Sequence, residues 1–86
     1  MIEVRAATVL SISIGDGITE LRCQMEGHGA PYYFTAQSTD EAIRVWFRSL
    51  SAGAVIPLRG SPWPKLHREA RRYELCLDVA GEIEGS

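Results

Sequence analysis

The feature that most constrains the fold of this chain is an alternation of residue character that runs from Ile2 to Ile14. The even positions of this segment are Ile, Val, Ala, Thr, Leu, Ile and Ile, whereas the odd positions include Glu3, Arg5, Ser11 and Ser13. Successive side chains of a β-strand point to opposite faces, so this period of two predicts a long strand that is buried on one face. Gly15-Asp16-Gly17 follows, and glycines beside an aspartate favour a tight hairpin. The chain is therefore expected to begin with a strand that folds straight back.

The next two segments also have the character of strands. Leu21, Cys23 and Met25 alternate with charged and polar residues, which predicts a second strand with one solvent-facing side. The stretch from Gly27 to Pro31 breaks the alternation. The segment from Tyr32 to Ala36 then resumes with aromatic residues of high strand preference, so a third strand is expected there.

A helix is predicted between the third and fourth strands. Ser38-Thr39-Asp40-Glu41 matches a capping box, in which the serine hydroxyl accepts a backbone N–H and the glutamate reaches back. One helical face then carries apolar side chains, namely Ala42, Ile43, Trp46, Phe47 and Leu50. Gly53 suits a left-handed residue after the helix, so the helix is predicted to run from Ser38 to Ala52.

The last third of the chain is predicted to contain two more strands. The segment from Ala54 to Arg59 is expected to be a short fourth strand closed by Gly60, in which Pro57 implies an edge or a bulge. The segment from Ser61 to Arg71 is predicted to be a loop or a short turn of helix. Alternation from Tyr73 to Val79 indicates a fifth strand.

Length and composition indicate one soluble globular domain. The chain has 86 residues, of which 45% are hydrophobic and 23% are charged. We expect a single domain over residues 1–80 and a disordered acidic tail over residues 81–86. The apolar runs are far shorter than the roughly 20 residues that cross a bilayer, so no membrane contact is expected. Glu3 and Arg5 interrupt the first apolar residues, which argues against an export signal and favours a cytoplasmic protein.

The sequence contains no pattern that is typical of a catalytic or metal site. Cys23 and Cys76 lie within alternating patterns and are expected to be buried thiols, with a disulfide as the alternative. Together with His28 and His67 they lack the paired spacing of metal ligands. A nucleophile elbow, a glycine-rich phosphate loop and a metalloprotease motif are also missing. We therefore expect a protein that binds rather than catalyses, without a cofactor or metal.

The distribution of charge indicates where binding would occur. The formal net charge is -2, yet five of the nine basic residues lie between Arg59 and Arg72, where Glu69 is the one acid. These residues are Arg59, Lys65, Arg68, Arg71 and Arg72, and His67 lies among them. From Tyr73 to Ser86 the chain has four acids and no base. A local positive segment within an acidic chain points to an anionic ligand or an acidic partner.

The element order of three strands, one helix and two strands resembles the OB-fold, a five-stranded, partly open Greek-key barrel. Leu50-x-x-Gly53-x-Val55-x-x-x-Gly60, followed after the basic segment by Arg72-Tyr73-Glu74-Leu75, is similar to a stretch of bacterial single-stranded DNA-binding proteins and their primosomal relatives. In that stretch a helix and a short strand each end in glycine and a flexible basic loop leads to the last strand. The resemblance implies a mainly β fold, a small OB-like barrel with one helix between strands three and four. An SH3-like barrel or an α+β roll is the alternative.

The candidate binding residues combine cations with aromatic rings. Cations that track phosphates and aromatic side chains that stack on bases hold single-stranded nucleic acid. Candidate contacts are Tyr33, Arg59, Trp63, Lys65, His67, Arg68, Arg71 and Arg72. The alternative for Trp63, which lies between Pro62 and Pro64, is a stiff lid over one end of the barrel, with the arginines paired to nearby acids. We expect single-stranded DNA or RNA as the partner, and the alternative is a protein-interaction module that uses the same residues to dock a protein.

Two further expectations concern packing. A short proline-containing fourth strand and an aromatic third strand leave apolar edge surface, which favours a homo-oligomer. The predicted core consists of Val4, Leu10, Ile12, Leu21, Cys23, Phe34, Ile43, Trp46, Leu50, Ile56, Leu75 and Leu77. Tyr33 must point away from its neighbours Tyr32 and Phe34, so it becomes a stacking candidate if those two rings belong to the core.

Overall fold

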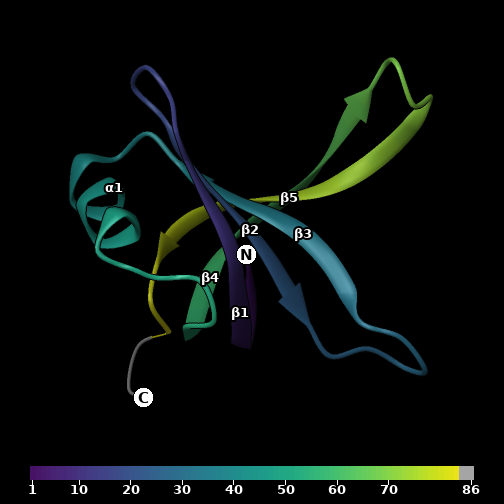
Figure 1. The fold of residues 1–86 in the computed structure, drawn as a ribbon, viewed down its shortest axis with the longest axis horizontal. Coiled ribbons are helices and arrows are strands. Elements are labelled where there is room, and N and C mark those ends of the chain that lie inside the picture. Colours follow the sequence, from purple (N-terminus) through teal and green to yellow (C-terminus); the bar gives the residue numbers. More distant parts are fainter. Residues whose placement is uncertain (84–86) are drawn as a thin grey trace.

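Five strands form one sheet that closes on itself, with a single helix between the third and fourth strands (Figure 1). The computed structural model describes residues 1–83, and at His67 the backbone alone. The elements in chain order are β1 (Ile2–Ile14), β2 (Thr19–Met25), β3 (Tyr32–Ser38), α1 (Glu41–Arg48), β4 (Val55–His67) and β5 (Arg72–Gly81). The fold is therefore mainly β, as the sequence predicts.

The strands follow the order β1-β2-β3-β5-β4 around the ring. β1 pairs with β2 and also with β4, and both pairings are antiparallel. β3 and β5 pair in parallel through Thr35 to Gln37 and Cys76 to Asp78. The expected hairpin between the first two strands is present, and the pairing of the first strand with the fourth closes the ring.

Two irregularities in β1 decide which of its residues reach the core. The register shifts between Val4 and Ala7, opposite Pro57, so the proline of β4 lies at a bulge, as the sequence predicts. A second shift between Val9 and Ser11 leaves Leu10 as an extra residue. Before the first shift the even-numbered position Val4 is buried, whereas after it the odd-numbered positions Ala7 and Val9 are buried. The predicted core position of Leu10 is wrong, because the bulge turns this side chain outward.

The helix is shorter than predicted and has a different cap. It spans Glu41–Arg48, and the N-cap is Asp40, whose carboxylate accepts a hydrogen bond from the Ile43 N–H at 3.2 Å. The Ser38 hydroxyl instead accepts from the Asp40 N–H at 3.0 Å, in the turn that precedes the helix. The helix ends at Arg48 with Ser49 as its C-cap, so Gly53 belongs to the connection to β4, where its N–H donates to the Val9 carbonyl.

One face of α1 packs against the closed part of the sheet. Phe47 is completely buried, whereas Ile43, Trp46 and Leu50 are partly buried against the core. The helix contacts β1, β2, β3 and β5. The sequence places the core contact at Trp46, but Phe47 on the same face takes the innermost position, and the Trp46 ring lies 5.5 Å from it between centroids.

The segment predicted as a loop after Gly60 is instead a strand. β4 continues through His67 and pairs with β5 in an unbroken antiparallel register from Gly60 and Val79 to His67 and Arg72. The turn between the two strands is Arg68 to Arg71. Figure 1 shows this hairpin extending away from the rest of the sheet. Lys65 and Arg72 are therefore held on the strands of a two-stranded ribbon, and Arg68 and Arg71 lie in its turn.

The core itself is largely the predicted one, with exceptions in β5 and β3. Buried residues include Val4, Leu21, Cys23, Phe34, Ile56 and Leu77, all of which were expected. Ile12 is partly buried against this core. Leu75 and Tyr32 are exposed, because they lie beyond the part of the sheet that closes. Both cysteines are buried free thiols, which confirms that prediction.

The C-terminal part of β5 extends beyond the predicted domain boundary. The strand reaches Gly81, and the Glu82 carbonyl accepts a hydrogen bond from Arg59 Nε at 3.0 Å. Structure therefore continues into the segment predicted to be a tail, and residues 84–86 lie outside the described residues. In residues 1–83, α1 lacks the length and apolar character that crossing a membrane requires.

Candidate nucleic-acid interface

The outer face of four neighbouring strands gathers several of the predicted binding residues. Cross-strand pairing puts Arg22 beside Thr35, Thr35 beside Cys76, Cys76 beside Trp63, and Glu74 beside Lys65. The residues between them, such as Cys23, Phe34 and Leu77, are buried in the core. Since side chains alternate between the two faces of a sheet, these paired residues share the face that points away from the core. We call this surface the outer face and define it by Arg22, Tyr33, Thr35, Trp63, Lys65, Glu74 and Cys76.

A charged network occupies the middle of the outer face. Arg22 forms an ion pair with Glu74. The same guanidinium donates to the Thr35 hydroxyl at 3.5 Å, and that hydroxyl donates to Glu74 at 3.2 Å. These contacts join β2, β3 and β5, which fixes the Arg22 head group above the sheet. The outer face carries two cations, Arg22 and Lys65, and the ion pair with Glu74 neutralises the charge of Arg22.

Tyr33 lies at the side of this network. The Arg22 guanidinium carbon is 5.9 Å from the centre of the Tyr33 ring, within the range of a cation–π contact. The tyrosine is 49% exposed, so the rest of its ring remains accessible to solvent. An aromatic ring held by an arginine on an open sheet surface is a suitable platform for a planar ligand.

Trp63 and Lys65 contribute to the outer face from β4. Trp63 is half-buried and lies directly opposite Cys76, and its indole N–H is buried without a hydrogen-bond partner among the described residues. Trp63 belongs to a paired strand rather than to the loop that the sequence predicts. Burial raises the pKa of the Cys76 thiol, and the nearby Lys65 ammonium opposes part of this rise. Lys65 therefore lies close enough to act electrostatically on the centre of the face.

The turn of the β4–β5 hairpin carries the densest positive charge. Arg68, Arg71 and Arg72 are all exposed, and Glu69 is the acid between them. Arg71 has a φ of 51°, a left-handed conformation that non-glycine residues adopt mainly in turns. The backbone of His67 ends β4 beside them, and its side chain lies outside the described set. The turn directly follows β4, the strand that carries Trp63 and Lys65.

Arg59 is separated from the other predicted residues. It lies near the start of β4, eight residues from His67, a span of about 26 Å along an extended strand. Its guanidinium donates to the Glu82 carbonyl and also contacts the Met1 sulfur at 3.5 Å. The side chain therefore links Met1 to Glu82, and it lies outside the candidate interface.

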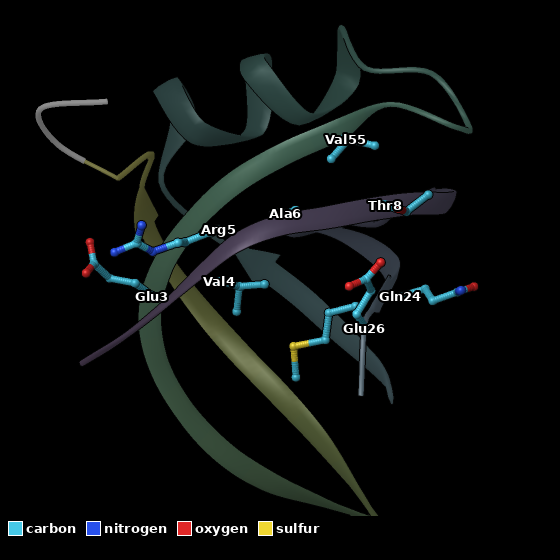
Figure 2. Close-up of a pocket in the computed structure, with 9 residues that line it drawn as sticks. Glu3, Val4, Arg5, Ala6, Thr8, Gln24, Glu26 and Val55 are labelled. Atoms are coloured by element: carbon cyan, nitrogen blue, oxygen red, sulfur yellow. The ribbon is translucent and has the colours of Figure 1, made fainter. Parts of the chain in front are cut away.

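A groove elsewhere on the molecule has a different character. It lies where the N-terminal half of β1 diverges from the end of β2, and Figure 2 shows Glu3 and Arg5 on β1 and Glu26 at the end of β2 around Val4. The acids on both sides of this groove disfavour a polyanion. A second groove near the start of α1 also carries acids, Asp40 and Asp78. Neither groove resembles the basic hairpin.

Sequence reasoning missed four residues of the outer face, namely Arg22, Thr35, Glu74 and Cys76. Arg22 was placed on a solvent-facing position without a role, and Glu74 was considered as a partner for the arginines of the basic segment. The pairing of Arg22 with Glu74 across β3 depends on the parallel contact of β3 with β5. The alternation in the second strand, which puts Arg22 on the polar side, is the signal that could have drawn attention to it. The described residues contain no cluster of three or more side chains suited to a metal ion.

Comparisons with protein-family models, curated proteins and solved structures found no match for this chain.

Proposed function

We propose that the closed sheet is an OB-type barrel and that its outer face, with the hairpin turn, binds single-stranded nucleic acid without sequence preference. The observation that carries this proposal is the convergence of Tyr33, Trp63 and Lys65 on one side of the sheet, continuous with the arginine-bearing turn. Strands two and three and the connection between strands four and five are the regions that OB-folds use for oligonucleotides. The chemistry and the position of the residues therefore support the same ligand.

A single strand fits this surface better than a duplex. Tyr33 and Trp63 can stack on bases, and stacking needs bases that are not already paired. The cations lie at the hairpin, so phosphates are expected there and bases over β3 and β4.

The strength of the electrostatic contribution follows from the number of available cations. Arg22 is paired with Glu74, which leaves Lys65, Arg68, Arg71 and Arg72 as the candidate phosphate contacts. Four such contacts would give a slope of about -3 for log affinity against log salt, at about -0.7 per contact for single strands. The rest of the chain has a net negative charge and repels phosphates, so contacts with the nucleic-acid backbone are expected in this region alone.

We expect the double substitution Arg68→Ala and Arg71→Ala to weaken binding equally for all oligonucleotide sequences. Two lost phosphate contacts should make the salt slope shallower by about 1.4. Anisotropy of labelled oligodeoxythymidine, oligodeoxyadenosine and single-stranded RNA, measured over a salt series, checks this. The matched control is Arg5→Ala with Arg48→Ala, which removes the same charge from exposed positions away from the hairpin. If the two double variants bind oligonucleotides with equal affinity, binding depends on the net charge of the protein and not on the hairpin turn, and the proposed site is wrong.

Replacing Tyr33 or Trp63 with leucine should weaken binding by about 1 to 3 kcal/mol each, without a change in the salt slope, because stacking releases no counterions. Tyr32→Leu is the matched control, since Tyr32 is an exposed neighbour on the opposite side of β3. The same anisotropy titrations give both the affinity and the slope. Equal losses for Tyr32 and Tyr33 would contradict a stacking role for the outer face. Failure of every oligonucleotide to bind at low salt would instead favour the docking of a protein.

A further inference from the structure

The β4–β5 hairpin has a second face, which is apolar and exposed. Cross-strand pairs on this face are Pro62 with Leu77, Pro64 with Leu75, and Leu66 with Tyr73. Tyr73 is 70% exposed, Leu66 49% and Leu75 39%, and both prolines are also exposed. We call Pro62, Pro64, Leu66, Tyr73 and Leu75 the apolar strip.

The apolar strip is a continuation of the core-facing side of the sheet. Leu58 and Leu77 are buried in the core, and the strip residues have the same alternation as these two along β4 and β5. The inward-facing pattern thus extends beyond the closed part of the sheet, where no described residue covers it. Contiguous apolar surface of this kind usually marks a contact with another molecule.

The partner is expected to pack on the face of the hairpin rather than on its edge. Beyond Gly60, β4 no longer pairs with β1, so one edge of the strand is open. Proline cannot donate a backbone hydrogen bond, and Pro62 and Pro64 lie in this part of the strand. The edge is therefore poorly suited to the addition of another strand, whereas the apolar side chains remain available.

Charge indicates what the partner is. The hairpin segment from Lys65 to Arg72 has a net charge of +3, so the rest of the chain carries -5. A second copy of this chain offers an identical apolar strip together with an acidic body. In an antiparallel arrangement each basic turn would lie over the acidic body of the other copy, while a parallel arrangement would bring the two basic turns together.

We propose that a second copy of this chain packs its apolar strip against the first, about a two-fold axis, with the two hairpins antiparallel. A two-fold contact uses the same patch on both protomers, as a self-complementary strip requires. The strip and the outer face are opposite sides of one ribbon, so pairing through the strip leaves the outer face, with Trp63 and Lys65, uncovered in both copies. The dimer does not rest on the proposed nucleic-acid function, and each can fail without the other.

The first test changes the strip. Sedimentation over a micromolar concentration series should show the mass of the wild-type protein rising from 9.5 kDa toward twice this value. Leu66→Ser with Tyr73→Ser should weaken dimerisation by about a hundredfold, as loss of two central apolar contacts does in protein interfaces. Oligonucleotide binding per protomer at low protein concentration should be retained. Ile14→Ser with Val45→Ser is the matched control, because both side chains are exposed and lie outside the hairpin.

The second test reports the geometry. Leu75→Cys places a thiol at the middle of the strip, and a short bis-maleimide should link two such protomers, whereas Arg68→Cys at the turn should not cross-link. Native Cys23 gives little background because burial raises the pKa of its thiol to about 11, and burial also raises the pKa of Cys76. Cross-linking at position 68 instead of 75 would overturn the antiparallel arrangement. A wild-type protein that stays at 9.5 kDa throughout the series would overturn the dimer itself.

Discussion

Replacing Phe47 with alanine is expected to lower the free energy of unfolding by about 3 to 5 kcal/mol, which is a large part of the stability of a small domain. Phe47 is completely buried beneath the helix, and its removal would leave a cavity that the surrounding strands cannot fill. Urea denaturation followed by far-ultraviolet circular dichroism measures this loss. Because α1 is eight residues long and depends on this contact, helical signal should be lost with it.

Trp46→Ala provides the matched comparison. Trp46 is adjacent to Phe47 and belongs to the same helix, but it is partly exposed. Its truncation removes a larger side chain from a less buried position, so it should destabilise the protein by less than Phe47→Ala. A greater loss for Trp46 would show that the tryptophan, as the sequence alone suggests, is the principal anchor of the helix.

Gly60→Ala is expected to destabilise the protein by about 3 kcal/mol, at the upper end of the range for overpacking. A Cβ atom at this position would lie 2.3 Å from the Asp78 carbonyl oxygen and 3.0 Å from the Val79 Cα. These neighbours are backbone atoms of β5 and cannot rotate away. Gly60 also lies at the register shift between β4 and β5, so the strands approach closely at the base of the hairpin.

Gly53→Ala separates this steric effect from backbone strain. Gly53 has a φ of +93°, and nothing lies within 4 Å of the position a Cβ would take. Its substitution should destabilise by about 1 kcal/mol through the left-handed backbone alone. Thermal and urea unfolding of both variants compare the two effects. Equal losses would contradict the close approach of β4 and β5 at Gly60.

The positions of the strands follow closely from local pattern. The first strand has the predicted bounds, because thirteen alternating residues and a glycine-rich turn leave no competing local structure. The position of the helix was predicted correctly, but its first residue was not. Ser38, Asp40 and Glu41 are all residues that favour a helix start. Which of them caps the helix depends on where β3 ends, and β3 continues to Ser38 through its pairing with β2.

The faces of the strands were harder to predict than their positions. A single extra residue reverses the side to which all following residues point, and the bulge at Leu10 has no signature in the sequence. The β4 part of the hairpin was predicted to be a loop because it contains two prolines. Pro62 and Pro64 argue against a central strand, and they are tolerated here because this part of β4 has one open edge.

The sequence by itself determined the order and type of the elements, the segregation of basic residues between Lys65 and Arg72, and the burial of Cys23. These properties follow from local periodicity and composition. The tertiary structure alone decided which residues meet. Strand register placed Tyr33 and Trp63 on one face with Arg22 and Glu74, and it placed Arg59 beside Met1 and Glu82. Register depends on pairings between segments far apart in the chain, and local pattern does not specify those pairings.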